Sequence, residues 1–120
     1  MFWRYCIIVK LYMKGEDIKM NSKFYCEYKL KKSVSVADFL SASEKLNNEY
    51  ICKQKGYVSW EQLNDNDTWA DIITFETMGD VKTFEANSAN AGELAQNFYS
   101  FINLPSCKVR YYTIERSYEK

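Results

Sequence analysis

The chain has 120 residues, of which 16 are basic and 16 acidic, so its formal net charge is zero, and 47% of the residues are hydrophobic. This length and composition predict one folded domain with a substantial core. Because there is no basic excess, we expect neither a nucleic-acid nor a membrane partner. The sequence contains no histidine, which excludes Ser-His-Asp and Cys-His catalysis and histidine-ligated haem.

The first nineteen residues contain a short apolar run, Cys6 to Val9, between Arg4 and Lys10. This run is shorter than a signal-peptide core and far below the ~20 residues of a membrane span. We therefore predict a leader of undefined structure at residues 1–19, a single domain at residues 20–120 and a cytoplasmic location. The four cysteines form no CxxC pair, which favours free thiols over a metal site.

Alternating apolar and polar side chains in KFYCEYKL predict a strand at residues 23–30. Apolar residues then recur at helical spacing as far as Tyr50. Ser35 suits the N-cap position of this helix, Asp38 its first turn, and Gly56 its end. The first part of the chain is therefore predicted to be a strand followed by a helix.

Two further strands are predicted at residues 57–63 and 68–76, with the sequences YVSWEQL and TWADIITFE. The polar segment NDND joins them, and Asn and Asp suit such a turn because they tolerate the left-handed conformation. Residues 77–103 are helical in pattern, are interrupted at NSANAG, and are ended by Pro105. A last strand is predicted at residues 107–119.

The predicted order is strand, helix, strand, strand, helix, strand. Right-handed crossovers turn this order into a four-stranded antiparallel sheet with both helices on one face, the α+β ferredoxin-like plan. Helices cover only one face of such a sheet, yet both faces of residues 69–75 are largely apolar. We therefore predict that the second face packs against another copy of the chain, which gives a homodimer.

The chain resembles the dimeric α/β barrels of the antibiotic biosynthesis monooxygenase superfamily over residues 22–116. The resemblance is carried by KQKGYVSWEQL after the first helix, TWADIITFET before the second, and FYSFINLPSCKVRYYTIE at the end. It implies a ferredoxin-like subunit that pairs its sheet with a second subunit to form a barrel. It also implies a ligand cavity between the sheet and the helices of each subunit. These motifs are specific for a fold rather than for one reaction.

Members of this superfamily differ in chemistry: some oxidise polycyclic phenols without metal or flavin, and others degrade haem. The haem-degrading branch uses an Asn on the first strand, a Trp at the end of the third and a His on the second helix. Glu27 and Phe75 stand near the first two of these positions, and the chain has no histidine. The resemblance therefore points away from haem degradation, and we expect no cofactor.

If Phe75 faces the helices as its family counterpart does, strand alternation places Trp69, Asp71 and Ile73 on the same face. Asp71 then enters the cavity, and Glu27, on a neighbouring strand taken as parallel, enters it as well. Two carboxyl groups in an apolar pocket could serve as base and acid. The alternative, which is the commoner situation, is that each lies at a strand end, paired with Lys or Arg or in water.

Aromatic side chains are the other candidates for a ligand site. Trp60, Trp69 and Phe75 could stack on a planar ligand, and the Tyr111 hydroxyl could donate a hydrogen bond to a phenolic or quinone oxygen. The tryptophans would more often simply fill the core. With ten tyrosines in the chain, any single one is weak evidence.

Two functional hypotheses of different class stay open. The first is a cofactor-independent monooxygenase, a homodimer that oxidises an aromatic or quinol-type substrate in one cavity per subunit. The second is a non-catalytic ligand-binding or structural dimer of the same fold, with a small apolar or aromatic ligand as its partner. A cavity with a carboxyl group facing open space favours the first hypothesis. A cavity filled by Phe75, Phe84 and Phe98 favours the second.

Overall fold

A computed structural model describes residues 20–120, so the predicted leader at residues 1–19 lies outside the described part of the chain. The first half forms a strand, a helix and a hairpin: β1 (Ser22–Leu30), α2 (Val36–Glu49), the 3₁₀ turn η1 (Ile51–Lys53), β2 (Tyr57–Asp65) and β3 (Thr68–Phe75). The second half forms a helical region and a strand: α3 (Met78–Ala86), the 3₁₀ turn η2 (Ser88–Ala91), α4 (Glu93–Tyr99) and β4 (Ile102–Thr113).

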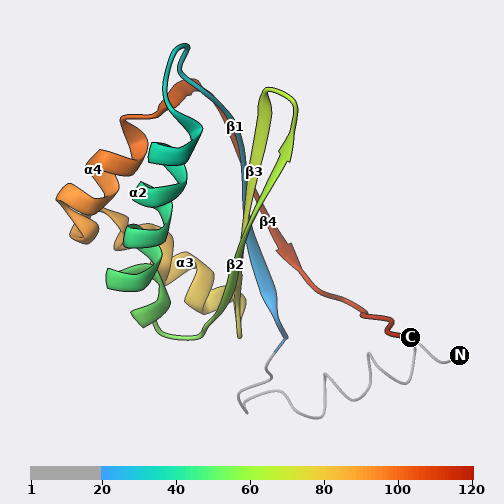
Figure 1. Cartoon of the computed structure of the whole chain (residues 1–120). Helices are drawn as coiled ribbons and strands as arrows, with labels where there is room; N and C mark the ends of the chain where they lie inside the picture. The colour runs from blue at the N-terminus through green and yellow to red at the C-terminus, as the bar shows by residue number, and fades with distance from the viewer. Residues whose placement is uncertain (1–19) are drawn as a thin grey trace, which may run out of the picture.

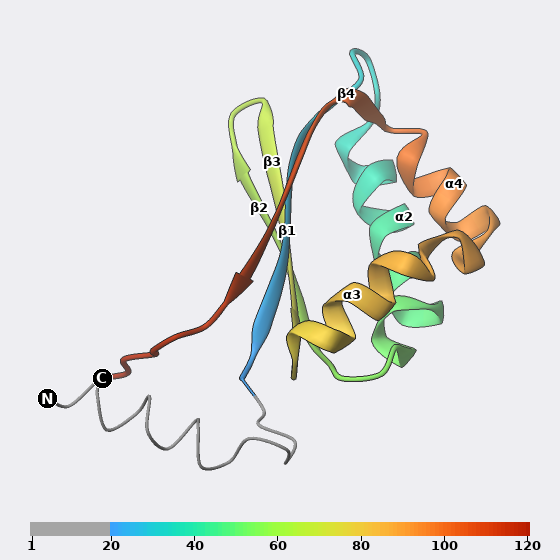
Figure 2. The same ribbon diagram turned by 180° about the vertical axis from the view of Figure 1, so that it is seen from behind.

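The four strands form one sheet in the order β2-β3-β1-β4, in which every neighbouring pair is antiparallel. Helices α2, α3 and α4 lie on one side of this sheet, and the other side carries no helix of the described residues (Figures 1 and 2). The predicted ferredoxin-like plan is confirmed. One detail of the prediction is wrong, because β1 and β3 run antiparallel rather than parallel.

The starts of α2 and α3 are set by side-chain caps, as the sequence predicts for the first of them. Ser35 Oγ accepts a hydrogen bond from the Asp38 backbone N–H at 3.2 Å, and Thr77 Oγ1 accepts one from the Asp80 N–H at 3.0 Å. Each cap satisfies a backbone donor that the first helical turn leaves unpaired. Gly56 follows η1 with a φ of +78°, and the Asp80 carboxyl fills the space that a side chain at this position would need.

The last strand begins earlier than predicted, at Ile102 instead of residue 107, and it ends at Thr113. Pro105 therefore lies inside β4 rather than closing the helical region. A break in the β1–β4 register accommodates it, and there the Lys29 backbone N–H donates to Ser106 Oγ at 2.9 Å instead of to the neighbouring strand. A proline is tolerated here because β4 is an edge strand with an irregularity, where one missing donor costs little.

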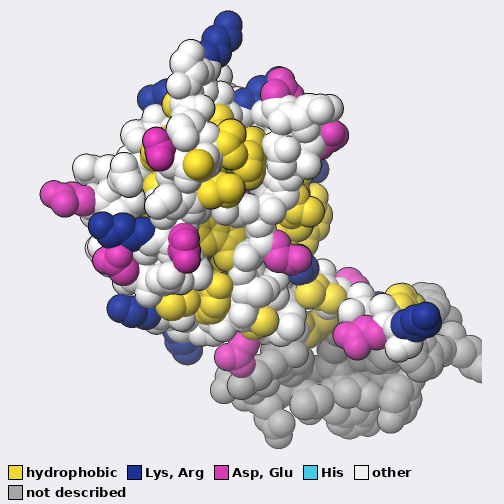
Figure 3. Space-filling model, in the orientation of Figure 1, with side chains coloured by type: hydrophobic (Ala, Val, Ile, Leu, Met, Phe, Trp, Pro, Cys, Tyr) yellow, Lys and Arg dark blue, Asp and Glu magenta, His cyan; other side chains and the backbone are white. Residues whose placement is uncertain are grey.

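The core lies between the helices and the sheet and is largely aromatic. Phe39 of α2 packs on Trp69 of β3 and Phe98 of α4, with ring centroids 5.2 and 5.4 Å apart. Phe75 packs on Phe84 of α3 at 5.1 Å. Figure 3 shows apolar side chains along the seam between α2 and the sheet, surrounded by charged ones. Among residues 20–120, no helix is long and apolar enough to cross a bilayer.

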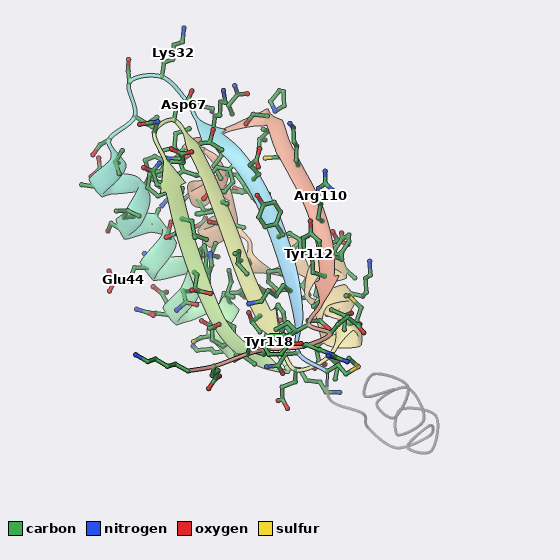
Figure 4. The ribbon with its side chains drawn as sticks, turned by 90° about the vertical axis from the view of Figure 1, so that its right-hand side faces the viewer. Lys32, Glu44, Asp67, Arg110, Tyr112 and Tyr118 are labelled. Carbon is green, nitrogen blue, oxygen red and sulfur yellow. The ribbon has the colours of Figure 1, made fainter. Side chains whose placement is uncertain are left out.

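The opposite side of the sheet, which we call the open face, is seen in Figure 4 with Arg110 and Tyr112 on its β4 edge. Its central strands contribute the partly buried side chains of Tyr25 and Ile72. Tyr25 makes an edge contact with Tyr112 at 6.1 Å between ring centroids. After β4, the chain leaves the sheet on this side (Figures 1 and 2). The open face thus mixes apolar and charged side chains, whereas the helix side is a continuous aromatic core.

Candidate functional site

A partly enclosed cavity of about 310 Å³ lies between the sheet and the helices. Its wall is mainly apolar and aromatic, with contributions from all four strands and all three α-helices. Its size is at the lower end of the range of about 300–1,000 Å³ for small-molecule sites. A larger groove of about 740 Å³ around Lys29–Lys32 and Leu104 is open to solvent. We place the candidate site in the enclosed cavity because it holds the buried titratable groups.

Asp71 is the central polar residue of the cavity. It lies in the middle of β3, opposite Cys26 of β1 and Gln62 of β2, and strand alternation turns its side chain toward the helices. Only 5% of its surface is exposed. The hydroxyl of Tyr28, itself 1% exposed, donates a hydrogen bond to Asp71 Oδ1 at 2.7 Å. The carboxyl group is therefore held by a phenol, and no Lys or Arg of the described residues forms an ion pair with it.

Two further donors lie beside the Asp71 carboxyl group. The Gln62 amide contributes to the stabilisation of the carboxylate and also donates to Ser43 Oγ at 3.0 Å, which ties the site to α2. The Trp60 indole N–H contributes in the same direction. However, within the described part of the chain Trp60 Nε1 is buried without a hydrogen-bond partner of acceptable geometry. We regard this N–H as an available donor, because it lies near the Asp71 carboxyl group without forming a hydrogen bond to it.

Burial raises the pKa of Asp71 from 3.8 to about 7, since desolvation disfavours the charged carboxylate. The hydrogen bond from Tyr28 and the nearby N–H groups of Trp60 and Gln62 oppose this rise and do not cancel it. At neutral pH the carboxyl group is consequently divided between its two protonation states. A buried group poised in this way can accept a proton from a ligand and return it, which is the requirement for a general base.

Two thiols line the same cavity, Cys26 on β1 and Cys107 on β4, and both are free. Burial raises the pKa of Cys26 to about 12, with the neighbouring Cys107 and Asp71 adding to the rise. Burial also raises the pKa of Cys107. Because the thiolate is the nucleophilic form, these cysteines are poor nucleophiles at neutral pH. They form part of the wall rather than a reactive pair.

The outer part of the cavity wall includes Tyr99 at the end of α4 and Glu85 of α3, both exposed. The Tyr111 hydroxyl of β4 donates a hydrogen bond to Glu85 Oε2. Lys82 Nζ lies 3.5 Å from the centre of the Tyr111 ring. Tyr111 therefore positions Glu85 and does not itself line the cavity.

The structure brings only some of the predicted site residues together. Asp71 and Trp60 line the cavity. Trp69 and Phe75 face the helices as predicted, but they are packed into the core, 9% and 0% exposed, and do not line the cavity. The predicted place of Glu27 is wrong, because it lies on the open face, where it accepts a hydrogen bond from the Tyr25 hydroxyl at 3.0 Å.

The alternative of a strand-end carboxylate in an ion pair does not describe Asp71, which is buried in mid-strand. The partner that the sequence did not reveal is Tyr28. Tyr28 lies two residues after Cys26 and four after Phe24 along β1, so strand alternation predicts that all three point to the same side of the sheet. Its pairing with Trp69 depends on the β1–β3 register, and no local pattern in the sequence defines that register.

No family model matches the chain, and no curated protein matches it in sequence. Solved structures do match it. SnoaB from Streptomyces nogalater, described as a cofactor-independent oxygenase, has a TM-score of 0.67 at 12% identity, covering 84% of this chain and 99% of its own. A Bordetella bronchiseptica protein provisionally named an antibiotic biosynthesis monooxygenase has a TM-score of 0.66 at 10% identity, covering 84% and 100%.

A dimeric protein of ferredoxin-like fold from Bacteroides fragilis has a TM-score of 0.54 at 20% identity, covering 78% of this chain and 96% of its own. At these identities the matches establish a shared fold. The ferredoxin-like fold that the resemblance implies is thus confirmed.

Proposed function

We propose that the cavity is a catalytic site in which Asp71 acts as a general base on a small aromatic or quinol-type substrate, which molecular oxygen then oxidises without a cofactor. The observation that carries this proposal is the position of Asp71, a buried carboxyl group with a pKa of about 7 in the wall of an apolar cavity. The fold shared with an oxygenase described as cofactor-independent supports it. The other hypothesis, a non-catalytic binding or structural dimer, explains the cavity but gives this carboxyl group no role.

The chemistry assigned to each residue follows from its contacts. Ionised Asp71 removes a proton from an acidic O–H or C–H bond of the substrate, leaving a resonance-stabilised anion. The Trp60 N–H, which has no partner among the described residues, then donates to the oxygen on which this negative charge develops. Tyr28 keeps its hydrogen bond to Oδ1 and so orients the carboxyl group. Oxygen then takes electrons from the anion; one of its atoms enters the product as a carbonyl, and the other leaves as water.

We also infer that two copies of the chain pair through the open face. Ile72 and Tyr25 lie at the centre of this face, and Leu63 and Tyr112 lie toward its edges with 47% and 48% of their surfaces exposed. Apolar groups of this size on one face are stabilised when a second sheet covers them. The dimeric Bacteroides fragilis protein of ferredoxin-like fold supports the inference.

Anthrone is a suitable test substrate because it is an uncharged tricyclic carbon acid, and its conversion by oxygen into anthraquinone and water is balanced. We expect the wild-type protein to accelerate oxygen uptake, with a rate that rises with pH through about 7 as Asp71 ionises. Asp71→Asn should lower that rate by about 10²- to 10⁴-fold. Asp65→Asn, an exposed carboxyl group at the tip of the β2–β3 hairpin, is the matched control and should leave it unchanged.

An Asp71→Asn variant that is folded and as active as the wild type would overturn the assignment of the base. Absence of anthrone turnover by the wild-type protein, together with saturable binding of anthrone in the cavity, would favour the non-catalytic ligand-binding hypothesis.

A further inference from the structure

We infer that the cavity selects its ligand by charge: it admits uncharged or cationic aromatic molecules and rejects anions. The inference rests on the cavity of the proposed function and names the class of ligand that it takes. It does not require turnover, because it concerns binding alone.

The first observation is the set of ionisable groups in the cavity wall. The described residues that line it include two carboxyl groups, two thiols and two phenols, namely Asp71, Glu85, Cys26, Cys107, Tyr28 and Tyr99. Each of these groups is either neutral or negative. No Lys or Arg of the described chain is part of this wall. Every ionisation inside the cavity therefore adds negative charge, and none can supply a positive partner for an anion.

The second observation is the position of the Lys82 ammonium group. Lys82 lies over the Tyr111 ring, and Tyr111 in turn donates to Glu85. Lys82 is exposed and is not part of the cavity wall. Its ammonium group contacts the Tyr111 ring, which does not line the cavity either. A ligand carboxylate or phosphate in the cavity would meet the Glu85 and Asp71 carboxyl groups first.

The third observation is that the hydrogen-bond donors of the cavity wall are all neutral. The Tyr28 hydroxyl is already bonded to Asp71, and the Gln62 amide is bonded to Ser43. The Trp60 N–H is the buried donor without a partner in the described residues. This N–H can bind a phenolic or carbonyl oxygen. The other donors of the wall, such as the Tyr99 and Ser88 hydroxyls, are neutral as well, so none supplies the opposite charge that a buried anion needs. A ligand hydroxyl group suits the site better than an anion, because it can accept a hydrogen bond from the Trp60 N–H and donate one to the Asp71 carboxylate.

Proton linkage follows from the same geometry. Asp71 is faced by Tyr28 and Cys26 of β1, Gln62 and Trp60 of β2, Cys107 of β4 and Tyr99 of α4, and among these groups there is no cation to offset its charge. An anion can then enter only while Asp71 is protonated. Above a pH of about 7, its affinity should fall by about tenfold for each pH unit, whereas the affinity of an uncharged ligand should not.

Three probes of matched shape test the inference: 2-naphthol, which is uncharged, 2-naphthylmethylamine, which is cationic, and 2-naphthoate, which is anionic. Their affinities for the full chain would be measured by isothermal titration calorimetry between pH 5.5 and 8.5. At pH 8 we expect 2-naphthol and the amine to bind at least tenfold more tightly than 2-naphthoate. In Asp71→Asn, 2-naphthoate should bind at least tenfold more tightly than in the wild type at pH 8, and its pH dependence should disappear.

Glu85→Gln provides a graded comparison. Glu85 is exposed and screened by solvent, so its loss should improve 2-naphthoate binding less than the loss of Asp71 does. Asp65→Asn, outside the cavity, should change none of the three affinities. Equal or tighter binding of 2-naphthoate by the wild type at pH 8 would overturn the inference. Failure of all three probes to bind would overturn it as well, because the cavity would then not be an aromatic site.

These outcomes are separate from those of the oxidation experiment. Charge selection without turnover of anthrone would retain this inference and remove the catalytic proposal. Turnover that depends on Asp71, combined with tight binding of 2-naphthoate above pH 7, would retain the catalytic proposal and remove this inference.

Discussion

The two faces of the sheet are built from the same strands but differ in how far they exclude water. Along β3, Asp71 and Ile73 point toward the helices, while Ala70 and Ile72 point to the open face. On the helix side, aromatic packing removes water so completely that a carboxyl group becomes hard to ionise. On the open face, Tyr25 and Glu27 are only partly buried, and the Tyr25 hydroxyl donates a hydrogen bond to Glu27 at 3.0 Å. Burial by the chain's own helices therefore creates the chemistry, and residue type alone does not.

The largest expected effect on stability comes from a substitution on the helix side of the sheet. Phe75, at the end of β3, is fully buried against Phe84 and Tyr57. Phe75→Ala should lower the free energy of unfolding by about 3–5 kcal/mol, because it removes a large apolar side chain and leaves a cavity. Urea unfolding followed by circular dichroism measures this value. Ile72→Ala on the open face is the comparison within the same strand, and in the monomer it should cost clearly less. Equal losses for both variants would show that the two faces are not distinct.

Asp71→Asn tests the burial of the carboxyl group through the pH dependence of protein stability. The rise of the Asp71 pKa from 3.8 to about 7 corresponds to a cost of roughly 4 kcal/mol for the ionised form in the folded protein. The folded state binds more protons than the unfolded state between these two values, so the stability contributed by protonated Asp71 is complete below pH 3.8 and is lost as pH rises through about 7. Asp71→Asn should therefore stabilise the protein at pH 8, by up to about 4 kcal/mol, and not at pH 4.

Urea midpoints of wild type and variant, measured across this pH range, give the difference directly. Destabilisation by Asp71→Asn at pH 8 would indicate that the carboxylate is favourably paired, contrary to its environment in the structure.

Tyr28→Phe tests the hydrogen bond that holds the carboxyl group. It removes the donor to Asp71 Oδ1 without creating a large void, so we expect a loss of about 1–3 kcal/mol in the free energy of unfolding. The pKa of Asp71 should rise further, because a bond that favours its charged form is gone. The double variant Tyr28→Phe with Asp71→Asn completes a thermodynamic cycle. Additive effects in this cycle would show that the two side chains are not coupled.

Ile72→Asp should have the smallest effect on the folding of a single chain and a large effect on assembly. Ile72 lies at the centre of the open face, where the monomer leaves it partly exposed. A charge there is tolerated in water but is unfavourable between two apolar surfaces. Sedimentation equilibrium should give about twice 14.2 kDa for the wild type and about 14.2 kDa for the variant. A wild-type chain that stays monomeric at micromolar concentration would remove the proposed interface.

Much of the fold is encoded in short-range patterns, which is why the sequence predicts it. The Ser35 cap, the alternation in β1 and β3, the NDND turn and the break between α3 and α4 each depend on neighbouring residues. The start of β4 is harder to predict, because Pro105 normally argues against a strand. Its place is decided by the edge position and the broken register against β1, which are properties of the assembled sheet.

The candidate site was predictable only in part, for a related reason. Alternation along β3 gives the correct face for Asp71, Trp69 and Phe75. It does not show which of them meets empty space and which is packed, because this depends on how α2 and α4 fill the volume above the sheet. The wrong prediction for Glu27 has a different origin, because it did not apply the alternation of side chains along β1. Phe24, Cys26 and Tyr28 point to the helix side, so Glu27 points to the open face.

The most direct test of the central claim is the ionisation of Asp71 itself. The carboxyl carbon of Asp71 can be followed by NMR in isotopically labelled protein between pH 3 and 9, with Asp71→Asn identifying its signal. A midpoint near pH 7, which shifts when 2-naphthol is added, is the predicted result for a buried base in a ligand cavity. A midpoint at or below 3.8 that 2-naphthol leaves unchanged would contradict it, because Asp71 would then be a solvated or ion-paired carboxylate with no part in binding a ligand.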